Sequence, residues 1–188
     1  MVDPEYALIR AIAAGDPQAF ERLVERYQNP LCNFVYRYLG DRATAEDITQ
    51  EVFMRVYRFA PRFAPKARVS SWVFQIARNL ALNEIERRRR ERVDQTAVNG
   101  ESGYAAWRSP AAPASSDLER EVMGALRDLP ENQRAALLLR VNEELSYREI
   151  GEILGLSVQS VESLLFRARQ QLRASLGRRQ GSRTFEPR

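Results

Sequence analysis

Apolar residues recur along the chain at intervals of three and four, and no segment alternates between apolar and polar residues as a strand would. In the N-terminal half this spacing predicts a helix that Asp16 caps and Pro17 opens, because a carboxylate can accept the first free amide hydrogens and proline has none. The same helix is expected to break or bend near Pro30 and to end at Gly40.

Two further helices are predicted in this half of the chain. Thr44 is expected to cap the first, which reaches about Arg58. Two prolines then exclude a continuous helix through "FAPRFAPKARV", and Ser70 opens a long helix that runs into Arg92.

The C-terminal part of the chain is predicted to hold four shorter helices. They span residues 117 to 128, 131 to 142, 146 to 154 and 157 to 176. The stretch from 93 to 117 differs, because it combines small and polar residues with two glycines and two prolines and shows no helical period. We interpret it as a flexible linker.

The composition narrows the class of protein. A chain of 188 residues with 44% apolar residues can form one medium domain or two small ones. It has a single cysteine and no histidine, so the usual zinc, haem and Ser-His-Asp sites lack their side chains. We therefore expect no cofactor, no metal and no enzyme activity. The start of the chain is unlike a signal peptide and no window approaches 18 uninterrupted apolar residues, which predicts a soluble cytoplasmic protein without membrane insertion.

The net charge of +4 is unevenly distributed. Residues 1 to 92 carry sixteen basic and twelve acidic side chains, and residues 157 to 188 carry seven basic and two acidic ones. Residues 118 to 156 reverse the balance, with five basic and eight acidic side chains. Positive charge therefore collects in two separate parts of the chain, and the composition alone does not decide what it binds.

The helix predicted from 44 to 58 has an apolar half and a polar half. The apolar half contains Ala45, Ile48, Val52, Phe53, Val56 and Tyr57. The polar half contains Asp47, Gln50, Glu51, Met54 and Arg58. This half could be a solvated surface, or it could dock on a basic helical partner, and the pattern alone leaves both interpretations open.

Aromatic and basic residues gather in the loop that follows, namely Phe59, Arg62, Phe63, Lys66 and Arg68. Basic groups that hold phosphates beside aromatic rings on which bases stack are typical of single-stranded nucleic acid binding. The next helix places a polar stripe on one face, formed by Trp72, Gln75, Asn79, Asn83 and Glu86, and ends in the run Arg87 to Arg90. Asparagines can hydrogen-bond base edges, although each aromatic residue could equally belong to a core.

The segment from Tyr147 fits a twenty-residue helix-turn-helix, with a small residue at Gly151, the turn glycine at Gly155 and a cap at Ser157. The second helix would bury Val161, Leu165, Ala168 and Leu172. Its outer face would present Gln159, Ser163, Phe166, Arg167 and Gln170, flanked by Arg169 and Arg173. Polar residues followed by arginines suit base contacts followed by phosphate contacts, whereas the alternative is a helical hairpin without a DNA role.

The predicted fold is thus all-α, with two small helical domains joined by a flexible linker. The expected domains are residues 1–92 and 118–177, with the linker at 93–117 and a basic tail at 178–188. The C-terminal domain is expected to contain four helices, including the helix-turn-helix.

Three segments together resemble one protein family. They read "DRATAEDITQEVFMRVYR", "SSWVFQIARNLALNEIERRRR" and "LPENQRAALLLRVNEELSYREIGEILGLSVQSVESLLFRARQQL". In order and spacing they resemble the extracytoplasmic-function (ECF) group of the sigma-70 family, small bacterial initiation factors that keep only the second and fourth sigma regions. The resemblance covers about residues 5 to 92 and 118 to 176.

The resemblance implies a role for each part of the chain. Core RNA polymerase would bind through its beta-prime clamp helices and beta flap, the clamp helices meeting Asp47, Gln50, Glu51, Met54 and Arg58. The minus-10 promoter element would meet Phe59, Arg62, Phe63, Lys66, Trp72, Arg78, Asn79, Asn83 and Arg87. The minus-35 duplex would meet Ser157, Gln159, Ser160, Ser163, Phe166, Arg167, Arg169, Gln170 and Arg173. An anti-sigma factor is a further partner that the resemblance implies.

Two departures from the family pattern bear on DNA recognition. Asn83 stands where the family often has aspartate, and "VESLL" stands where it often has "VKSRL", so that Glu162 and Leu164 replace basic residues. Leu164 borders the buried stripe and is expected to pack inward, which leaves more of the recognition to Ser163, Phe166 and Arg167.

Two other classes of protein remain as alternatives. A two-domain repressor or activator would use its C-terminal domain on an operator without polymerase, typically as a dimer on a palindrome. An enzyme acting on nucleic acid would need a metal cluster or a nucleophile with its base, and the sequence offers neither.

Overall fold

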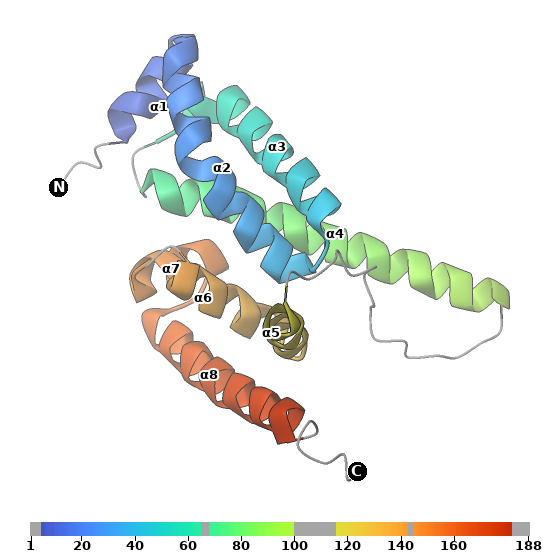
Figure 1. Cartoon of the computed structure of the whole chain (residues 1–188). Coiled ribbons are helices and arrows are strands. Elements are labelled where there is room, and N and C mark those ends of the chain that lie inside the picture. The colour runs from blue at the N-terminus through green and yellow to red at the C-terminus, as the bar shows by residue number, and fades with distance from the viewer. Residues whose placement is uncertain (1–4, 65–67, 100–115, 143–144, 182–188) are drawn as a thin grey trace.

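The computed structural model describes residues 5–64, 68–99, 116–142 and 145–181. Within these residues every regular element is helical, which confirms the predicted all-α class (Figure 1). The elements in chain order are α1 (Tyr6–Ala13), α2 (Pro17–Leu39), α3 (Arg42–Phe59), the 3-10 turn η1 (Ala60–Arg62), α4 (Val69–Asn99), α5 (Asp117–Arg127), α6 (Glu131–Asn142), α7 (Tyr147–Leu154) and α8 (Val158–Gly181).

Helix α2 begins and ends as the sequence predicts. The Asp16 carboxylate accepts hydrogen bonds from the amides of Gln18 and Ala19, and Gly40 ends the helix with a φ of 78°, which favours glycine. Pro30 does not break the helix, which continues on both sides of it. The stabilisation that α2 gains from packing along its length therefore exceeds the free-energy cost of the backbone hydrogen bond that proline cannot make.

Other helix ends differ from the prediction. Asp41, not Thr44, caps α3, and its carboxylate accepts hydrogen bonds from both the amide and the hydroxyl of Thr44. Helix α4 continues through Asn99, seven residues beyond Arg92 and into the segment assigned to the linker. Helix α8 continues to Gly181, into the segment assigned to the tail. Residues 100–115 of the expected linker and 182–188 of the expected tail lie outside the described residues.

Helices α1 to α4 form one unit with α2 at its centre. Helix α2 buries Leu23, Leu31 and Phe34 and contacts both α3 and α4, and the rings of Phe34 and Phe74 lie nearly perpendicular with their centroids 5.6 Å apart. Helices α5 to α8 form a second unit around Leu129, Leu139 and Leu165. Each unit thus contributes its own buried residues, as two small helical domains should.

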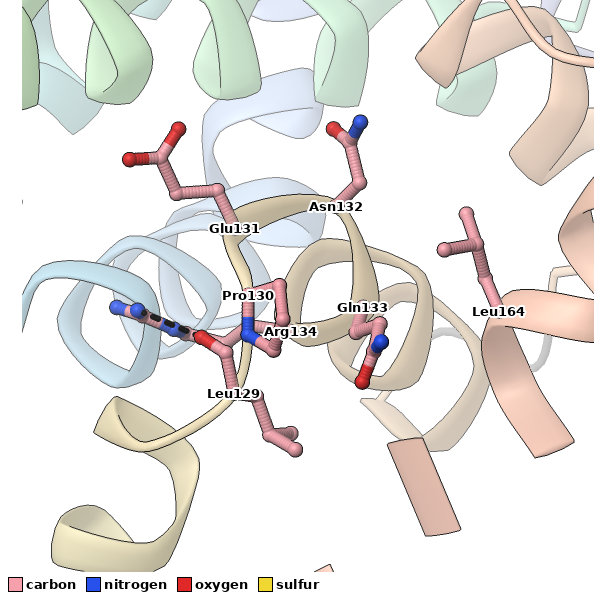
Figure 2. Close-up of a pocket in the computed structure, with 7 residues that line it drawn as sticks. All are labelled: Leu129, Pro130, Glu131, Asn132, Gln133, Arg134 and Leu164. Carbon is pink, nitrogen blue, oxygen red and sulfur yellow. Dashed lines mark hydrogen bonds between the residues drawn. The ribbon is translucent and has the colours of Figure 1, made fainter. Parts of the chain in front are cut away.

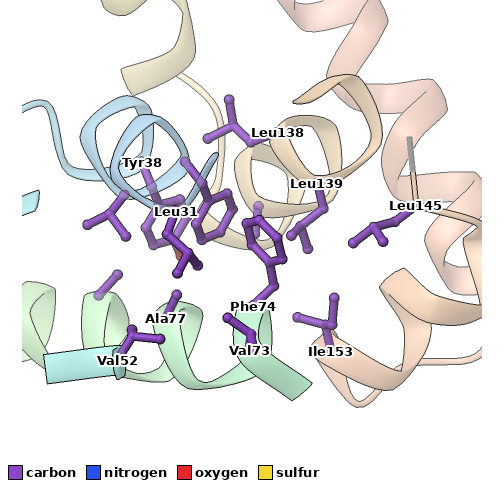
Figure 3. Packing of buried hydrophobic residues seen from close by; sticks show 14 of the residues in the cluster. Leu31, Tyr38, Val52, Val73, Phe74, Ala77, Leu138, Leu139, Leu145 and Ile153 are labelled. Carbon is purple, nitrogen blue, oxygen red and sulfur yellow. The ribbon is translucent and has the colours of Figure 1, made fainter. Parts of the chain in front are cut away.

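The two units pack directly against each other, which the sequence does not predict. Helices α6 and α7 lie against α2 and α4, and the buried residues of both units join in one apolar cluster. Figure 3 shows Phe74 between the α2 residues Leu31 and Tyr38 and the α6 residue Leu139. In the overall view the C-terminal end of α4 projects beyond both units (Figure 1).

Arg134 lies at the centre of this contact and is 9% exposed. Its guanidinium donates hydrogen bonds to the carbonyls of Tyr38 at 2.6 Å, Leu129 at 3.2 Å and Arg127 at 3.4 Å. It also lies over the Tyr38 ring, 5.4 Å from its centroid. Because burial disfavours the charged form, the pKa of Arg134 is lowered from its ordinary value. One side chain therefore ties the end of α2 to the turn between α5 and α6.

Candidate nucleic-acid interface

The first half of α8 is amphipathic in the way that the sequence predicts. Val161, Leu165 and Ala168 are buried and Leu172 is half-buried. All nine residues expected at the minus-35 duplex are exposed, namely Ser157, Gln159, Ser160, Ser163, Phe166, Arg167, Arg169, Gln170 and Arg173. Phe166, the large apolar member of this set, is 61% exposed.

The corner between α7 and α8 is fixed by local bonds. Gly155 has a φ of 67°, a conformation that favours glycine, and the amide of Leu156 donates to the Gly151 carbonyl at 2.9 Å. Helix α7 begins with a capping box, in which Ser146 and Glu149 each accept a hydrogen bond from the other's amide. The capping box thus fixes the start of α7, and the Gly155 corner with the Leu156–Gly151 bond joins α7 to α8 by a tight turn, as a helix-turn-helix requires.

Two members of the α8 set are partly occupied within the protein. The Ser157 hydroxyl accepts a hydrogen bond from the amide of Ser160 at 3.2 Å and lies 2.8 Å from the Ser160 hydroxyl.

Leu164 is half-buried and packs against the core cluster, as expected from its place at the edge of the buried stripe. It lines a shallow hollow with Leu129, Pro130, Glu131, Asn132, Gln133 and Arg134 (Figure 2).

The polar half of α3 is also exposed, and every member of the expected polymerase-binding set lies on it: Asp47, Gln50, Glu51, Met54 and Arg58. Met54 is 65% exposed. Tyr57, which the sequence assigns to the apolar half, is instead 55% exposed. Its ring lies at the margin of the core, with its centroid 5.4 Å from that of the Phe20 ring. The exposed surface of α3 is thus broader and more aromatic than the pattern indicates.

The loop after α3 divides its aromatic residues between surface and core. Phe59 is exposed, as is Arg62. Phe63 is half-buried between the rings of Trp72, at 4.5 Å, and Tyr6, at 5.8 Å. Lys66 lies outside the described residues. Of the two roles that the sequence leaves open for these aromatic residues, core packing or DNA contact, Phe63 and Trp72 have the first in this structure.

The polar stripe of α4 is exposed at Gln75, Asn79, Asn83 and Glu86, whereas Trp72 is half-buried. Arg78 lies at the edge of this stripe and is half-buried. Its guanidinium donates to the amide oxygen of Asn132 in α6 at 3.1 Å. The structure therefore brings one expected DNA-contacting residue of the first unit against the second unit.

The arginine run of α4 is largely engaged in contacts within the protein. Arg87 donates to Glu84 at 2.8 Å and also to Glu91. The hydrogen bonds and charges of these carboxylates raise the pKa of Arg87. The hydrogen bonds that Glu84 accepts from Arg87 and Arg88 lower the pKa of Glu84. Arg89 contacts Glu131 at 3.3 Å.

Arg88 has a structural role that the sequence analysis missed. Its guanidinium donates to Asp41 at 3.1 Å and to the Thr44 hydroxyl at 2.6 Å, and it also pairs with Glu84. Burial opposes ionisation of Asp41, but the hydrogen bonds from the hydroxyl and amide of Thr44, followed by the hydrogen bond and charge of Arg88, hold its pKa below the usual range. Arg88 thereby ties α4 to the start of α3. Four consecutive arginines give no signal of which one turns inward.

Comparison with known proteins assigns both units. Residues 23–91 match the family described as Sigma-70 region 2, and residues 119–172 match Sigma-70, region 4. The chain is 31% identical over 176 residues to the ECF RNA polymerase sigma factor SigW of Bacillus subtilis, covering 89% of this chain and 94% of that protein. It is 35% identical over 176 residues to the ECF RNA polymerase sigma-E factor of Haemophilus influenzae, covering 89% of this chain and 93% of that protein.

Solved structures agree with this assignment. The sigma factor RpoE of Bartonella quintana, crystallised with the anti-sigma factor NepR, matches 84% of this chain and 96% of its own, with a TM-score of 0.69 and 26% identity. CnrH in complex with the cytosolic domain of CnrY shares the fold, with a TM-score of 0.72 and 24% identity over 93% of this chain and 98% of its own. Within the described residues, no helix has the length and apolar character needed to cross a membrane.

The chain matches the two sigma regions in order and is similar to sigma factors over 89% of its length. These findings do not favour a repressor or activator that acts without polymerase. The chain belongs to the sigma-70 family and is an ECF-type RNA polymerase sigma factor.

Proposed function

We propose that the two units divide promoter recognition between them, with residues 1–92 as the unit for core polymerase and the minus-10 element and residues 118–177 as the unit for the minus-35 element. The observation that carries this proposal is that α3 and α8 each present an exposed polar face on a different unit. Residues 93–117, which begin in the last turns of α4, would then connect the two units, and residues 178–188, which begin in the last turn of α8, would be the tail.

The α3 face is proposed to dock on core polymerase. Glu51 pairs with Arg55 on its own helix at 2.7 Å, and among the described residues no ion pair or hydrogen bond joins its side chain to another helix. Its carboxylate can therefore exchange Arg55 for a basic partner at little cost, because exposed pairs of this kind contribute only about 0.3–0.5 kcal/mol. The exposed thioether of Met54 would add an adaptable apolar contact.

The loop after α3 and the stripe of α4 are proposed to stabilise opened DNA at the minus-10 element. Phe59 offers an exposed ring after α3, and Asn79 and Asn83 offer exposed amides on α4. Capture of an unstacked base returns about 1–3 kcal/mol, while unpairing a step costs a few kcal/mol, so one captured base biases opening without completing it. The chain itself would form or break no covalent bond, and polymerase would supply the rest of the melting energy.

The outer face of α8 is proposed to read the minus-35 duplex through Ser163, Phe166 and Arg167. Ser157 and Ser160 already bond each other at the helix start, so they would contact phosphate rather than bases. The NepR complex of the Bartonella quintana protein supports an anti-sigma partner for this chain as well. If the product of a neighbouring gene inhibited the transcription that this chain directs, that product would be identified as the partner.

Run-off transcription with core polymerase on fragmented genomic DNA tests the proposal. Wild-type chain should direct transcripts from specific promoters, and Glu51→Arg should weaken binding to core polymerase at least tenfold with little change in thermal stability. Glu25→Arg, the same charge change at an exposed position of α2, is the matched control and should bind normally. Absence of specific transcripts from wild-type chain, or equal loss of binding in both variants, would refute the proposed roles.

A further inference from the structure

Helix α1 lies outside the residues that match the sigma-70 regions, since the first match begins at residue 23. It packs against α2 and against η1, the turn that follows α3 (Figure 1). We propose that α1 is a positioning element for the loop after α3, and that Tyr6 holds this loop in place for an unstacked base by packing on Phe63. This inference rests on the proposed role of that loop at the minus-10 element.

Three rings from three elements form the contact between α1 and the loop. The centroid of the Tyr6 ring in α1 lies 5.8 Å from that of Phe63, and the Phe63 centroid lies 4.5 Å from that of Trp72 in α4. The ring planes are tilted, at 52° and 40°. Aromatic pairs about 4.5–7 Å apart attract each other beyond the effect of their buried area. We call Tyr6, Phe63 and Trp72 the aromatic anchor.

The anchor supplies much of what holds the loop. Among residues 59–64 only Ala60 is buried and only Phe63 is half-buried, and the others are exposed. The Phe63 amide donates to the Ala60 carbonyl at 3.2 Å, which joins these two residues across η1. Because Phe59 and Arg62 flank them in the same turn, their positions follow from where Ala60 and Phe63 are held.

Helix α1 is itself fixed on α2, so it can support the loop. A helix of eight residues is marginal in water by itself and needs tertiary contacts. Ile9 and Ile12 supply them, since each is only 2% exposed. The buried Glu5 carboxylate, just before the helix, accepts a hydrogen bond from the Tyr27 hydroxyl at 2.6 Å and pairs with Arg26 at 2.6 Å.

The benefit for DNA binding is preorganisation. A loop held in one position before DNA arrives loses less conformational entropy on binding than a loop that fluctuates. Phe59 keeps an exposed ring for a base, whereas Phe63 is packed between Tyr6 and Trp72. Tyr6 is therefore a positioning residue, which acts on DNA only through the place where it holds the loop.

Substitutions of Tyr6 in the full chain test the inference. Tyr6→Ala removes the α1 ring from the aromatic anchor, and Tyr6→Phe keeps it. The matched control is Tyr36→Ala, because Tyr36 is a half-buried tyrosine of the same unit and joins no ring pair among the described residues. Thermal melts would show that each variant folds, and Tyr6→Leu, which keeps apolar volume without a ring, replaces Tyr6→Ala if that variant does not.

The fluorescence of Trp72 reports the state of the anchor. The chain has two tryptophans, Trp72 and Trp107, so in a Trp107→Phe background the emission comes from Trp72 alone. Quenching by acrylamide then measures how well the Phe63 ring covers Trp72. Tyr6→Ala should raise the quenching constant, whereas Tyr6→Phe and Tyr36→Ala should leave it at the wild-type value.

Binding of single-stranded DNA reports the consequence for a captured base. The probes are a short fluorescein-labelled oligonucleotide of mixed sequence and an abasic oligonucleotide of the same length, which has phosphates but no bases. Tyr6→Ala should weaken binding to the first about two- to tenfold, the range that an aromatic pair contributes. Binding to the abasic probe should not change, because no phosphate-binding side chain is altered. Tyr6→Phe should bind both probes as wild type does.

Three results would overturn the inference. The first is unchanged Trp72 quenching or unchanged binding of the base-bearing probe in Tyr6→Ala. The second is an equal loss in Tyr36→Ala, because the effect would then be general destabilisation. The third is equal weakening on the abasic probe, because the loop would then act on phosphates and not on a base.

Neither measurement uses polymerase or a promoter, so run-off transcription by the wild-type chain remains a separate test of the proposed function. If transcription fails while Tyr6→Ala exposes Trp72 and weakens base-dependent binding, the anchor is supported and the proposed function is lost. If transcription succeeds while Tyr6→Ala matches wild type in both measurements, the proposed function stands and the anchor is lost.

Discussion

Gly151 is the position where the helix-turn-helix depends most directly on a missing side chain. A Cβ atom added there would lie 2.6 Å from the carbonyl oxygen of Leu156, well inside normal contact distance. That carbonyl belongs to the backbone just after the corner, and the Leu156 amide is bonded to the Gly151 carbonyl at 2.9 Å. The backbone here cannot move aside as the end of a flexible side chain can.

The magnitude follows from two opposed effects. Overpacking of a well-packed site costs about 1–3 kcal/mol, and a clash with fixed backbone belongs at the upper end. Alanine gains about 1 kcal/mol over glycine inside a helix, and Gly151 lies within α7. We therefore expect Gly151→Ala to lower the free energy of unfolding by about 2 kcal/mol.

Urea denaturation followed by circular dichroism measures this difference. Gly177→Ala is the matched control, because Gly177 lies in α8 with nothing within 4 Å of an added Cβ atom. It should raise the free energy of unfolding by about 0.5–1 kcal/mol through helix propensity alone. If Gly151→Ala proved as stable as Gly177→Ala, the steric account of the corner would be refuted.

Three further outcomes are expected. Arg88→Met should cost about 1–3 kcal/mol in a urea titration, because Asp41 loses a charged donor; an unchanged midpoint would show that the tether contributes nothing. Burial opposes ionisation of Glu149, but hydrogen bonds from Ser146 hold its pKa below the usual value, so its stabilisation is complete above about pH 4.3 and is lost as pH falls through the lower folded pKa. Urea midpoints measured against pH should therefore show Glu149→Gln losing its disadvantage on acidification, and a difference independent of pH would contradict this. Arg167→Ala should reduce the salt slope of duplex DNA binding by about 1, and an unchanged slope would exclude a phosphate contact.

The sequence predicts well whatever depends on helical periodicity. The exposed halves of α3 and α8 follow from a spacing of 3.6 residues, and glycines at 151 and 155 locate the corner between α7 and α8. These features are local, because each residue's face is set by neighbours three and four positions away. The sequence is correspondingly weaker at helix ends, where Asp41 rather than Thr44 caps α3 and α4 continues to Asn99.

Tyr57 and Phe63 mark the limit for aromatic residues. The pattern assigns Tyr57 to the core and leaves Phe63 undecided between core and DNA. In the structure Tyr57 is exposed beside Phe20, and Phe63 packs between Tyr6 and Trp72. Each outcome depends on a ring that lies far away in the sequence, so periodicity within one helix cannot decide it.

Long-range contacts set how distant helices meet, both within a unit and between the two units. Arg88 reaches Asp41 across 47 positions, and Arg134 reaches the Tyr38 carbonyl across 96. Nothing near either arginine in the chain distinguishes it from the arginines that stay at the surface. The sequence by itself therefore determined the helices, their exposed faces and the family, because these depend on local spacing and on motifs. Only the tertiary structure decided which arginines turn inward and that Glu131 and Asn132 of α6 lie against α4, because those outcomes depend on which distant surfaces come into contact.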